Sequence, residues 1–246
     1  MRYADICWRG VHASELGVIV TEQVAYKRPA LRREVVTIPG RSGTLTIKQA
    51  PAWECVTYTP GLAIRPGADR EAVYRWLQGS GQLIFGSMPD SAYEATLVDQ
   101  VEVTEQSPGH LAGYLLLAPT WECQPYRYDV VPEGIIRGVD SLRGFNAKNA
   151  PAAPRIMATV TPGAVLTLSM SGCEPMVIET PEAEADALEV ILDCDAQTVA
   201  TGAGMSLDAA MLGDFAHIAP GRWELVASCE NGSVQKLELL PRWRSI

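Results

Sequence analysis

Three histidines, His12, His110 and His217, are the side chains that could act as acids or bases near neutral pH. None of them lies in a pattern that places a nucleophile, a metal or a phosphate beside it. The chain contains no G-x-S-x-G, H-E-x-x-H or G-x-x-x-x-G-K-[ST] motif, and no G-x-G-x-x-G after a predicted strand. We therefore expect no catalytic residues and no enzymatic activity.

Asp193 and Asp195 flank Cys194 and would point to the same side of a strand, where two carboxylates could hold a hard cation. The alternative, which we favour, is that both face solvent on an acidic surface. The six cysteines form no C-x-x-C pair, so the spacing favours neither zinc nor a disulfide framework. We expect reduced and mostly buried thiols, with Cys55 and Cys123 as small inward residues of strands, and no metal or cofactor.

Composition limits the class of protein further. The chain has 246 residues, of which 47% are hydrophobic and 20% charged, which is typical of a folded protein with room for two cores. No apolar run approaches the roughly 18 residues that span a bilayer, and Asp5 lies where a secretory signal needs an apolar core, so we expect no membrane association. The net charge of −9 argues against binding nucleic acid through its phosphates.

The charge is unevenly distributed between the two parts of the chain. Residues 1–145 hold 14 Lys and Arg against 16 Asp and Glu, whereas residues 146–246 hold 6 against 13. Residues 141–154 show no sustained period and end in alanine and proline, which is typical of a connection. The sequence thus predicts a first domain over residues 1–140, a linker over 141–154 and a second domain over 155–246.

Alternating apolar and polar residues predict mainly strands in both domains. In the first domain they cover residues 34–38, 44–48 and 95–103, and the glycines of residues 39–43 indicate a hairpin turn. One helix is predicted over residues 69–78, capped by Asp69, with Trp76 on its apolar face and a Glu71–Arg75 pair one turn apart.

The second domain is predicted to be a β-sandwich. Its strands are expected over residues 155–160, 165–170, 176–178, 188–192, 223–227 and 234–240, with an acidic loop or short helix at 181–187. Trp223 and Trp243 raise a second possibility, because exposed indole rings can stack on sugars. Trp223 alternates with Leu225, however, so we expect it to be buried.

Several stretches resemble the distal tail proteins of long, flexible-tailed bacteriophages and related prophages. They are WRGVHASELGVIV (residues 8–20), TIPGRSGTL (37–45), YRWLQGSGQLIF (74–85) and CQPYRY (123–128), followed by LGDF (212–215), Pro220-Gly221 and LLPRWR (239–244). The order and spacing fit as well, whereas residues 163–210 match weakly.

The resemblance implies an N-terminal β domain with one helix and a projecting hairpin, followed by a galectin-like or carbohydrate-module-like sandwich. It also implies a structural role in the virion, after assembly in the host cytoplasm. Six copies would form a ring, single or stacked, that joins the tail tube to the baseplate or tail fibre hub, and DNA would pass through its bore without specific binding. A carbohydrate-binding module for host attachment is the alternative.

The segment at residues 30–47 is the candidate contact between subunits, because an exposed hairpin offers edge strands to a neighbour. Its basic cluster is conspicuous in an acidic protein, although such a run is also typical of a solvated surface. The candidate interface residues are Arg28, Arg32, Arg33, Arg41, Ile38 and Leu45, with Lys27 beside them.

Overall fold

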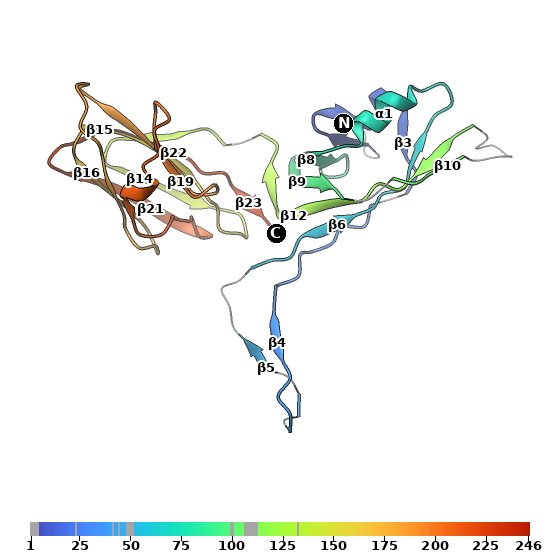
Figure 1. The fold of residues 1–246 in the computed structure, drawn as a ribbon, viewed down its shortest axis with the longest axis horizontal. Coiled ribbons are helices and arrows are strands. Elements are labelled where there is room, and N and C mark those ends of the chain that lie inside the picture. Colours follow the sequence, from blue (N-terminus) through green and yellow to red (C-terminus); the bar gives the residue numbers. More distant parts are fainter. Residues whose placement is uncertain are drawn as a thin grey trace. The chain divides into compact units, whose positions relative to one another are not determined.

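The structure is a computed structural model of the chain, and it is mainly β (Figure 1). It describes residues 5–22, 24–40, 42–43, 45–47, 52–98, 101–105, 113–131 and 133–246. Internal contacts divide the chain into two compact units, Met1–Val130 with Ile246, and Val131–Ser245. Among the described residues, no helix has both the length and the apolar composition needed to cross a membrane.

The first unit consists of antiparallel strands, one α-helix and one short 3-10 helix. Its elements are β1 (Ile6–Trp8), β2 (Val11–His12), η1 (Ala13–Leu16), β3 (Val18–Val20), β4 (Glu34–Val36), β5 (Leu45–Ile47), β6 (Val56–Tyr58), β7 (Leu62–Ile64), α1 (Arg70–Trp76), β8 (Ser80–Phe85), β9 (Ser91–Leu97), β10 (Val103–Glu105), β11 (Leu115–Leu117) and β12 (Trp121–Asp129). One sheet has the order β2-β1-β8-β9-β12, with β6 also paired to β12, and a second has the order β10-β11-β7-β3. Strands β4 and β5 pair with each other.

The core of the first unit forms around tryptophans. Trp8 and Trp121 are fully buried, and their ring centroids are 6.0 Å apart in an edge-to-face arrangement. Trp76 of α1 packs on Trp121 at 6.5 Å, which confirms its expected place in the core. The predicted helix is confirmed, since the side chain of Asp69 accepts a hydrogen bond from the backbone N–H of Ala72 at its start. The Arg75 guanidinium bonds the backbone carbonyl of Glu71 rather than its carboxylate.

The second unit contains two antiparallel five-stranded sheets. Its elements are β13 (Ile136–Gly138), β14 (Ser141–Asn146), β15 (Arg155–Val160), β16 (Val165–Met170), β17 (Met176–Glu179), β18 (Leu188–Asp193), β19 (Thr198–Thr201), η2 (Asp208–Ala210), β20 (Met211–Leu212), β21 (Gly221–Glu230), β22 (Val234–Leu240) and β23 (Arg244–Ser245). The sheet orders are β13-β22-β15-β18-β19 and β14-β21-β16-β17-β20. Alternate residues of both sheets, such as Ile156 and Leu166, are buried in one shared core.

The six strands expected in this region are all present, within a few residues of their expected ends. Trp223 is buried as expected, at 4% exposure. The division of the chain differs from the expected one, because it falls after Val130 and the expected linker contains β14, which pairs along its whole length with β21. The apolar pattern of β14 is hidden, since two of its three inward positions are Gly144 and Asn146.

Candidate functional site

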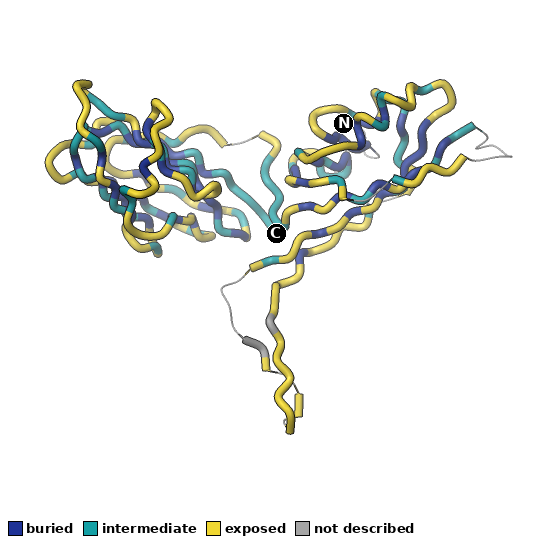
Figure 2. Tube along the Cα trace, in the orientation of Figure 1, coloured by how far each residue is buried: buried dark blue, intermediate teal, exposed yellow. Residues whose placement is uncertain are grey.

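Strands β4 and β5 form a hairpin that projects from the rest of the first unit (Figure 1). Its base is closed by a bridge between Leu31 and Trp53, and by backbone hydrogen bonds from Arg32 to Ala52 (2.8 Å) and from Glu54 to Ala30 (2.9 Å). Beyond this base, every side chain that the structure describes from residue 32 to residue 45 is exposed (Figure 2). The hairpin therefore carries no core of its own.

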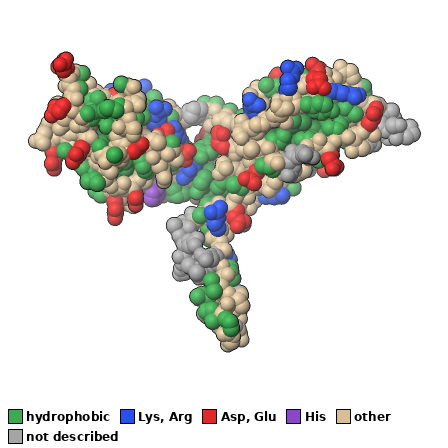
Figure 3. Space-filling view, in the orientation of Figure 1, with side chains coloured by type: hydrophobic (Ala, Val, Ile, Leu, Met, Phe, Trp, Pro, Cys, Tyr) green, Lys and Arg blue, Asp and Glu red, His purple; other side chains and the backbone are tan. Residues whose placement is uncertain are grey.

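Hydrophobic side chains cover much of the described hairpin (Figure 3). Val35 is 52% exposed, and Val36, Ile38 and Leu45 are each exposed by about two fifths. Val36 lies opposite Leu45 in the pairing of the two strands. A two-stranded sheet without a buried face is at best marginally stable in water, and exposed apolar surface of this kind is typical of contact sites.

The expected basic cluster lies toward the base of the hairpin, where Arg28, Arg32 and Arg33 are all exposed. Arg41 lies outside the described residues. Lys27 is anchored to the body of the unit, since its Nζ donates to the carbonyl of Thr57 at 2.9 Å. The cations and the apolar residues thus occupy successive stretches of the same projecting segment. Their role in subunit contact stays a prediction.

An aromatic cluster supports the chain where it enters the hairpin. The rings of Tyr26, Tyr58, Phe85 and Tyr93 lie 5.2–6.4 Å apart, in tilted or edge-to-face contacts. The hydroxyls of Tyr58 and Tyr93 are hydrogen-bonded at 3.0 Å, and burial together with this bond raises the pKa of Tyr93. These contacts connect Tyr26, which precedes the hairpin, to core residues of the first unit.

The two described histidines lie beside different partners. His12 Nδ1 lies 3.1 Å from the buried carboxylate of Asp5, and the hydroxyl of Ser14 donates to the same carboxylate at 3.0 Å. The serine is therefore bonded to the acid rather than to the imidazole. His217 Nδ1 lies 3.6 Å from the thiol of Cys173, and His110 falls outside the described residues.

Asp193 and Asp195, the candidate cation ligands, each form an ion pair with an arginine. Arg242 donates two hydrogen bonds to Asp193, at 2.6 and 2.7 Å, and this pair lowers the pKa of Asp193. Arg244 lies 3.4 Å from Asp195, whose side chain faces solvent as expected, whereas the side chain of Asp193 is only 21% exposed. Over the described part of the chain, no group of three or more His, Cys, Asp or Glu side chains could hold a metal ion.

The cysteines are free thiols, as expected, but they differ in burial. Cys123 is fully buried, and burial raises its pKa to about 12. Cys55 is exposed, so its expected inward position is wrong. The reason is register: Val56, the next residue, lies opposite Cys123 in the pairing of β6 with β12 and takes the inward position.

Comparison with known proteins identifies the fold. No family model and no curated protein sequence matches the chain. The crystal structure of the SPP1 Dit protein, described as a paradigm of the hub adsorption apparatus in phages that infect Gram-positive bacteria, aligns with a TM-score of 0.68. The alignment covers 96% of this chain and 97% of that one, at 13% sequence identity. The chain has the Dit fold.

Two further matches are to the baseplate of phage P2 in its activated conformation, with Ca and with Sr, each with a TM-score of 0.43, 9% identity and coverage of 92% and 90%. The Dit fold confirms, at the level of fold, the resemblance to distal tail proteins that the sequence motifs carried.

The sequence missed two exposed features of this Dit-fold chain. One is the pair Val35 and Val36, whose consecutive apolar side chains in a predicted hairpin were a usable signal. The other is Phe145 of β14, which is 63% exposed and borders an open groove of about 780 Å³ with Arg143 and Arg222. No signal pointed to it, because its strand was expected to be a linker.

Proposed function

We propose that this protein is a structural, non-enzymatic component of a phage tail tip, in which six copies close into a ring. The single observation that carries the proposal is the likeness to SPP1 Dit, which extends over nearly the full length of both chains and therefore includes both units. The motifs at residues 8–20, 37–45, 74–85 and 239–244 support it independently, because they point to the same class of protein.

In this proposal the hairpin makes the contact between subunits. A ring built head to tail needs two different, complementary surfaces on each subunit. The exposed apolar residues Val35, Ile38 and Leu45 supply one of them, and burying them against a neighbour would remove their surface from water. Arg28 and Arg32 at the base would meet carboxylates of the next subunit or of the tail tube.

The ring would join the tail tube to the baseplate or tail fibre hub in the virion, after assembly in the host cytoplasm. Its bore would let DNA pass, and the acidic balance of the chain suits that task. Carboxylates facing the bore would repel the phosphates of passing DNA rather than retain them.

The experiment that tests the ring is the mass of the purified protein by light scattering, followed by negative-stain images of the same peak. We expect six subunits, or twelve if two rings stack, and annular particles. Ile38→Asp should shift the protein toward monomer without changing its far-UV circular dichroism spectrum. Leu212→Asp, at an exposed leucine of the second unit, is the matched control and should assemble normally. A monomeric wild-type protein at high concentration would contradict the proposal.

A second candidate function, glycan binding, is favoured by the groove at Phe145. An exposed aromatic ring beside the guanidinium of Arg222 and the Arg143–Glu224 ion pair (2.7 Å) is a combination that can stack on a sugar and bond its hydroxyls. Binding on a glycan array that disappears in Phe145→Ala and persists in Leu212→Asp would favour it. An array without hits for the assembled protein would exclude it for the glycans displayed.

A further inference from the structure

The turn between β1 and β2 holds an arginine in an unfavourable backbone conformation. Trp8 pairs with Val11, so Arg9 and Gly10 form a two-residue hairpin turn, and both have positive φ, +53° and +80°. Turns of this kind favour Asn-Gly, because asparagine and glycine tolerate the left-handed region at least cost. An arginine at the first position carries backbone strain, and such strain clusters at sites of function.

The side chain of Arg9 lies in a cradle formed by two glycines of the GSG segment. A Cβ atom at Gly81 would lie 2.8 Å from Cγ of Arg9, and one at Gly79 would lie 3.5 Å from its Nη1. Nη1 also donates to the carbonyl of Gln78 at 3.1 Å. The backbone at Gly81 lies outside the left-handed region, so the space taken by Arg9 is what requires glycine there. The chain thus holds this guanidinium in a defined position.

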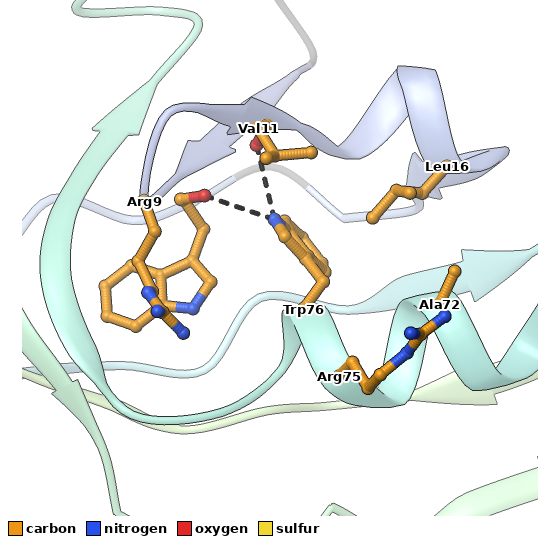
Figure 4. Close-up of a pocket in the computed structure, with 7 residues that line it drawn as sticks. Arg9, Val11, Leu16, Ala72, Arg75 and Trp76 are labelled. Carbon is orange, nitrogen blue, oxygen red and sulfur yellow. Dashed lines mark hydrogen bonds between the residues drawn. The ribbon is translucent and has the colours of Figure 1, made fainter.

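Arg9 borders a groove of about 330 Å³ that is lined mostly by apolar residues (Figure 4). Its other lining residues are Trp8, Val11, Leu16, Ala72, Arg75 and Trp76. The indole N–H of Trp76 donates to the carbonyls of Trp8 and Val11, each at 3.2 Å, which fixes the ring against the turn. In the view of Figure 4 this ring stands between the side chains of Arg9 and Arg75.

The groove combines two fixed cations with an apolar surface. The guanidinium of Arg75 is held by the carbonyl of Glu71 at 3.3 Å. Among the described ion pairs, none includes Arg9 or Arg75. Arginines so placed suit a carboxylate, which guanidinium groups bind with paired hydrogen bonds. The groove therefore fits a segment that presents a carboxylate next to an apolar side chain.

We propose that the edge strand β10 of a neighbouring copy occupies this groove, with Val103 on the apolar surface and Glu105 between the two arginines. The inference rests on the proposed ring and names its second contact. β10 is the end strand in the order β10-β11-β7-β3, and all three of its residues are exposed. Side chains two residues apart on a strand point to the same side, about 7 Å apart, so Val103 and Glu105 face a neighbour together.

The choice of β10 follows from a comparison of the described strands. β21 also pairs an exposed apolar residue, Val226, with a carboxylate two residues away, but Glu224 is already bonded to Arg143. Glu105 takes part in no described ion pair. The net charge of −9 also makes a second copy rich in carboxylates, so two arginines on one face suit contact between copies.

The test is the assembly equilibrium of the full chain, measured by analytical ultracentrifugation. Arg75→Glu should weaken association at least tenfold, and Arg75→Glu combined with Glu105→Arg should restore it, because the charges are exchanged. Glu102→Arg, one residue before β10 and on its opposite side, is the matched control and should associate as wild type. Arg9→Asn should weaken association while the far-UV circular dichroism spectrum stays that of wild type, since asparagine suits the turn.

The outcomes test the ring, the groove contact, the occupant β10 and the role of Arg9 separately. A wild-type protein that stays monomeric overturns the ring and this inference with it. A wild-type ring that Arg75→Glu leaves intact refutes the groove contact and leaves the ring standing. Loss of assembly that Glu105→Arg fails to restore refutes β10 as the occupant. Gly81→Ala, which displaces the Arg9 side chain, should act like Arg9→Asn on association, and normal assembly of both variants would contradict the role of Arg9.

Discussion

Gly144→Ala tests the packing of the second unit most directly. The φ of Gly144 lies outside the left-handed region, so alanine fits the backbone. A Cβ atom there, however, would lie 2.5 Å from Cζ2 and 2.7 Å from Cε2 of Trp223. Both distances are shorter than non-bonded carbon atoms can approach each other. The substitution therefore forces the buried Trp223 ring to move.

The cost follows from how little room that ring has. Trp223 is 4% exposed and packs on Trp243 at 6.4 Å between ring centroids. Overpacking of a well-filled core costs about 1–3 kcal/mol, and the reduced entropy of the unfolded chain returns about 0.4–1 kcal/mol. We expect a net loss of about 1–2 kcal/mol, which corresponds to a fall of about 3–8 °C in the unfolding temperature of this unit.

The assay is urea unfolding followed by circular dichroism and fluorescence. Gly134→Ala is the matched control, because a Cβ there meets nothing within 4 Å, and we expect its stability to stay within about 0.5 kcal/mol of wild type. Trp223→Phe should relieve the clash, since the smaller ring leaves room and the indole N–H of Trp223 has no hydrogen-bond partner. A Gly144→Ala protein as stable as Gly134→Ala, or a double variant with strictly additive losses, would refute the reasoning.

Three further outcomes are expected. Arg242 lowers the pKa of Asp193, so this pair adds stability above about pH 4 that is lost as the pH falls further; Arg242→Ala should cost about 1.5–3 kcal/mol at pH 7 in urea unfolding, and less at pH 3. A maleimide should label the exposed Cys55 in the folded protein and reach Cys123 only on unfolding, as mass spectrometry of the labelled protein would show. Asp69→Ala should lower stability by about 0.5–2 kcal/mol through loss of the cap of α1, measured by thermal unfolding.

The strands and the helix could be predicted from the sequence where apolar residues are buried and polar residues are exposed. β15 and β16 alternate regularly between buried and half-buried residues, and Asp69 marks the start of α1. The element β14 could not, because Gly144 contributes no side chain and Asn146 is buried by bonding the carbonyls of Ala150 and Ile218. A polar residue that is buried through hydrogen bonds to backbone carbonyls elsewhere in the chain does not show in the sequence as an inward position of a strand.

The candidate site was predicted only in part, for a similar reason. The turn glycines and the arginines marked the hairpin, and the structure confirms that the hairpin exists over β4 and β5. The groove at Arg9 was not foreseen, since Arg9, Trp76 and Gly81 meet only once β1, α1 and β8 are packed together. The pattern of neighbouring residues predicts secondary structure well, but it does not predict which side chains far apart in the sequence meet on one surface.

The exposed apolar side chains of the hairpin make the strength of subunit association depend on temperature. Covering the apolar side chains of Val35, Val36, Ile38 and Leu45 on assembly removes them from water, and such burial lowers the heat capacity of the system. Its driving force near room temperature is largely entropic, so it weakens on cooling. An assembly that depends on this segment would therefore hold its subunits less tightly near 4 °C than at 37 °C.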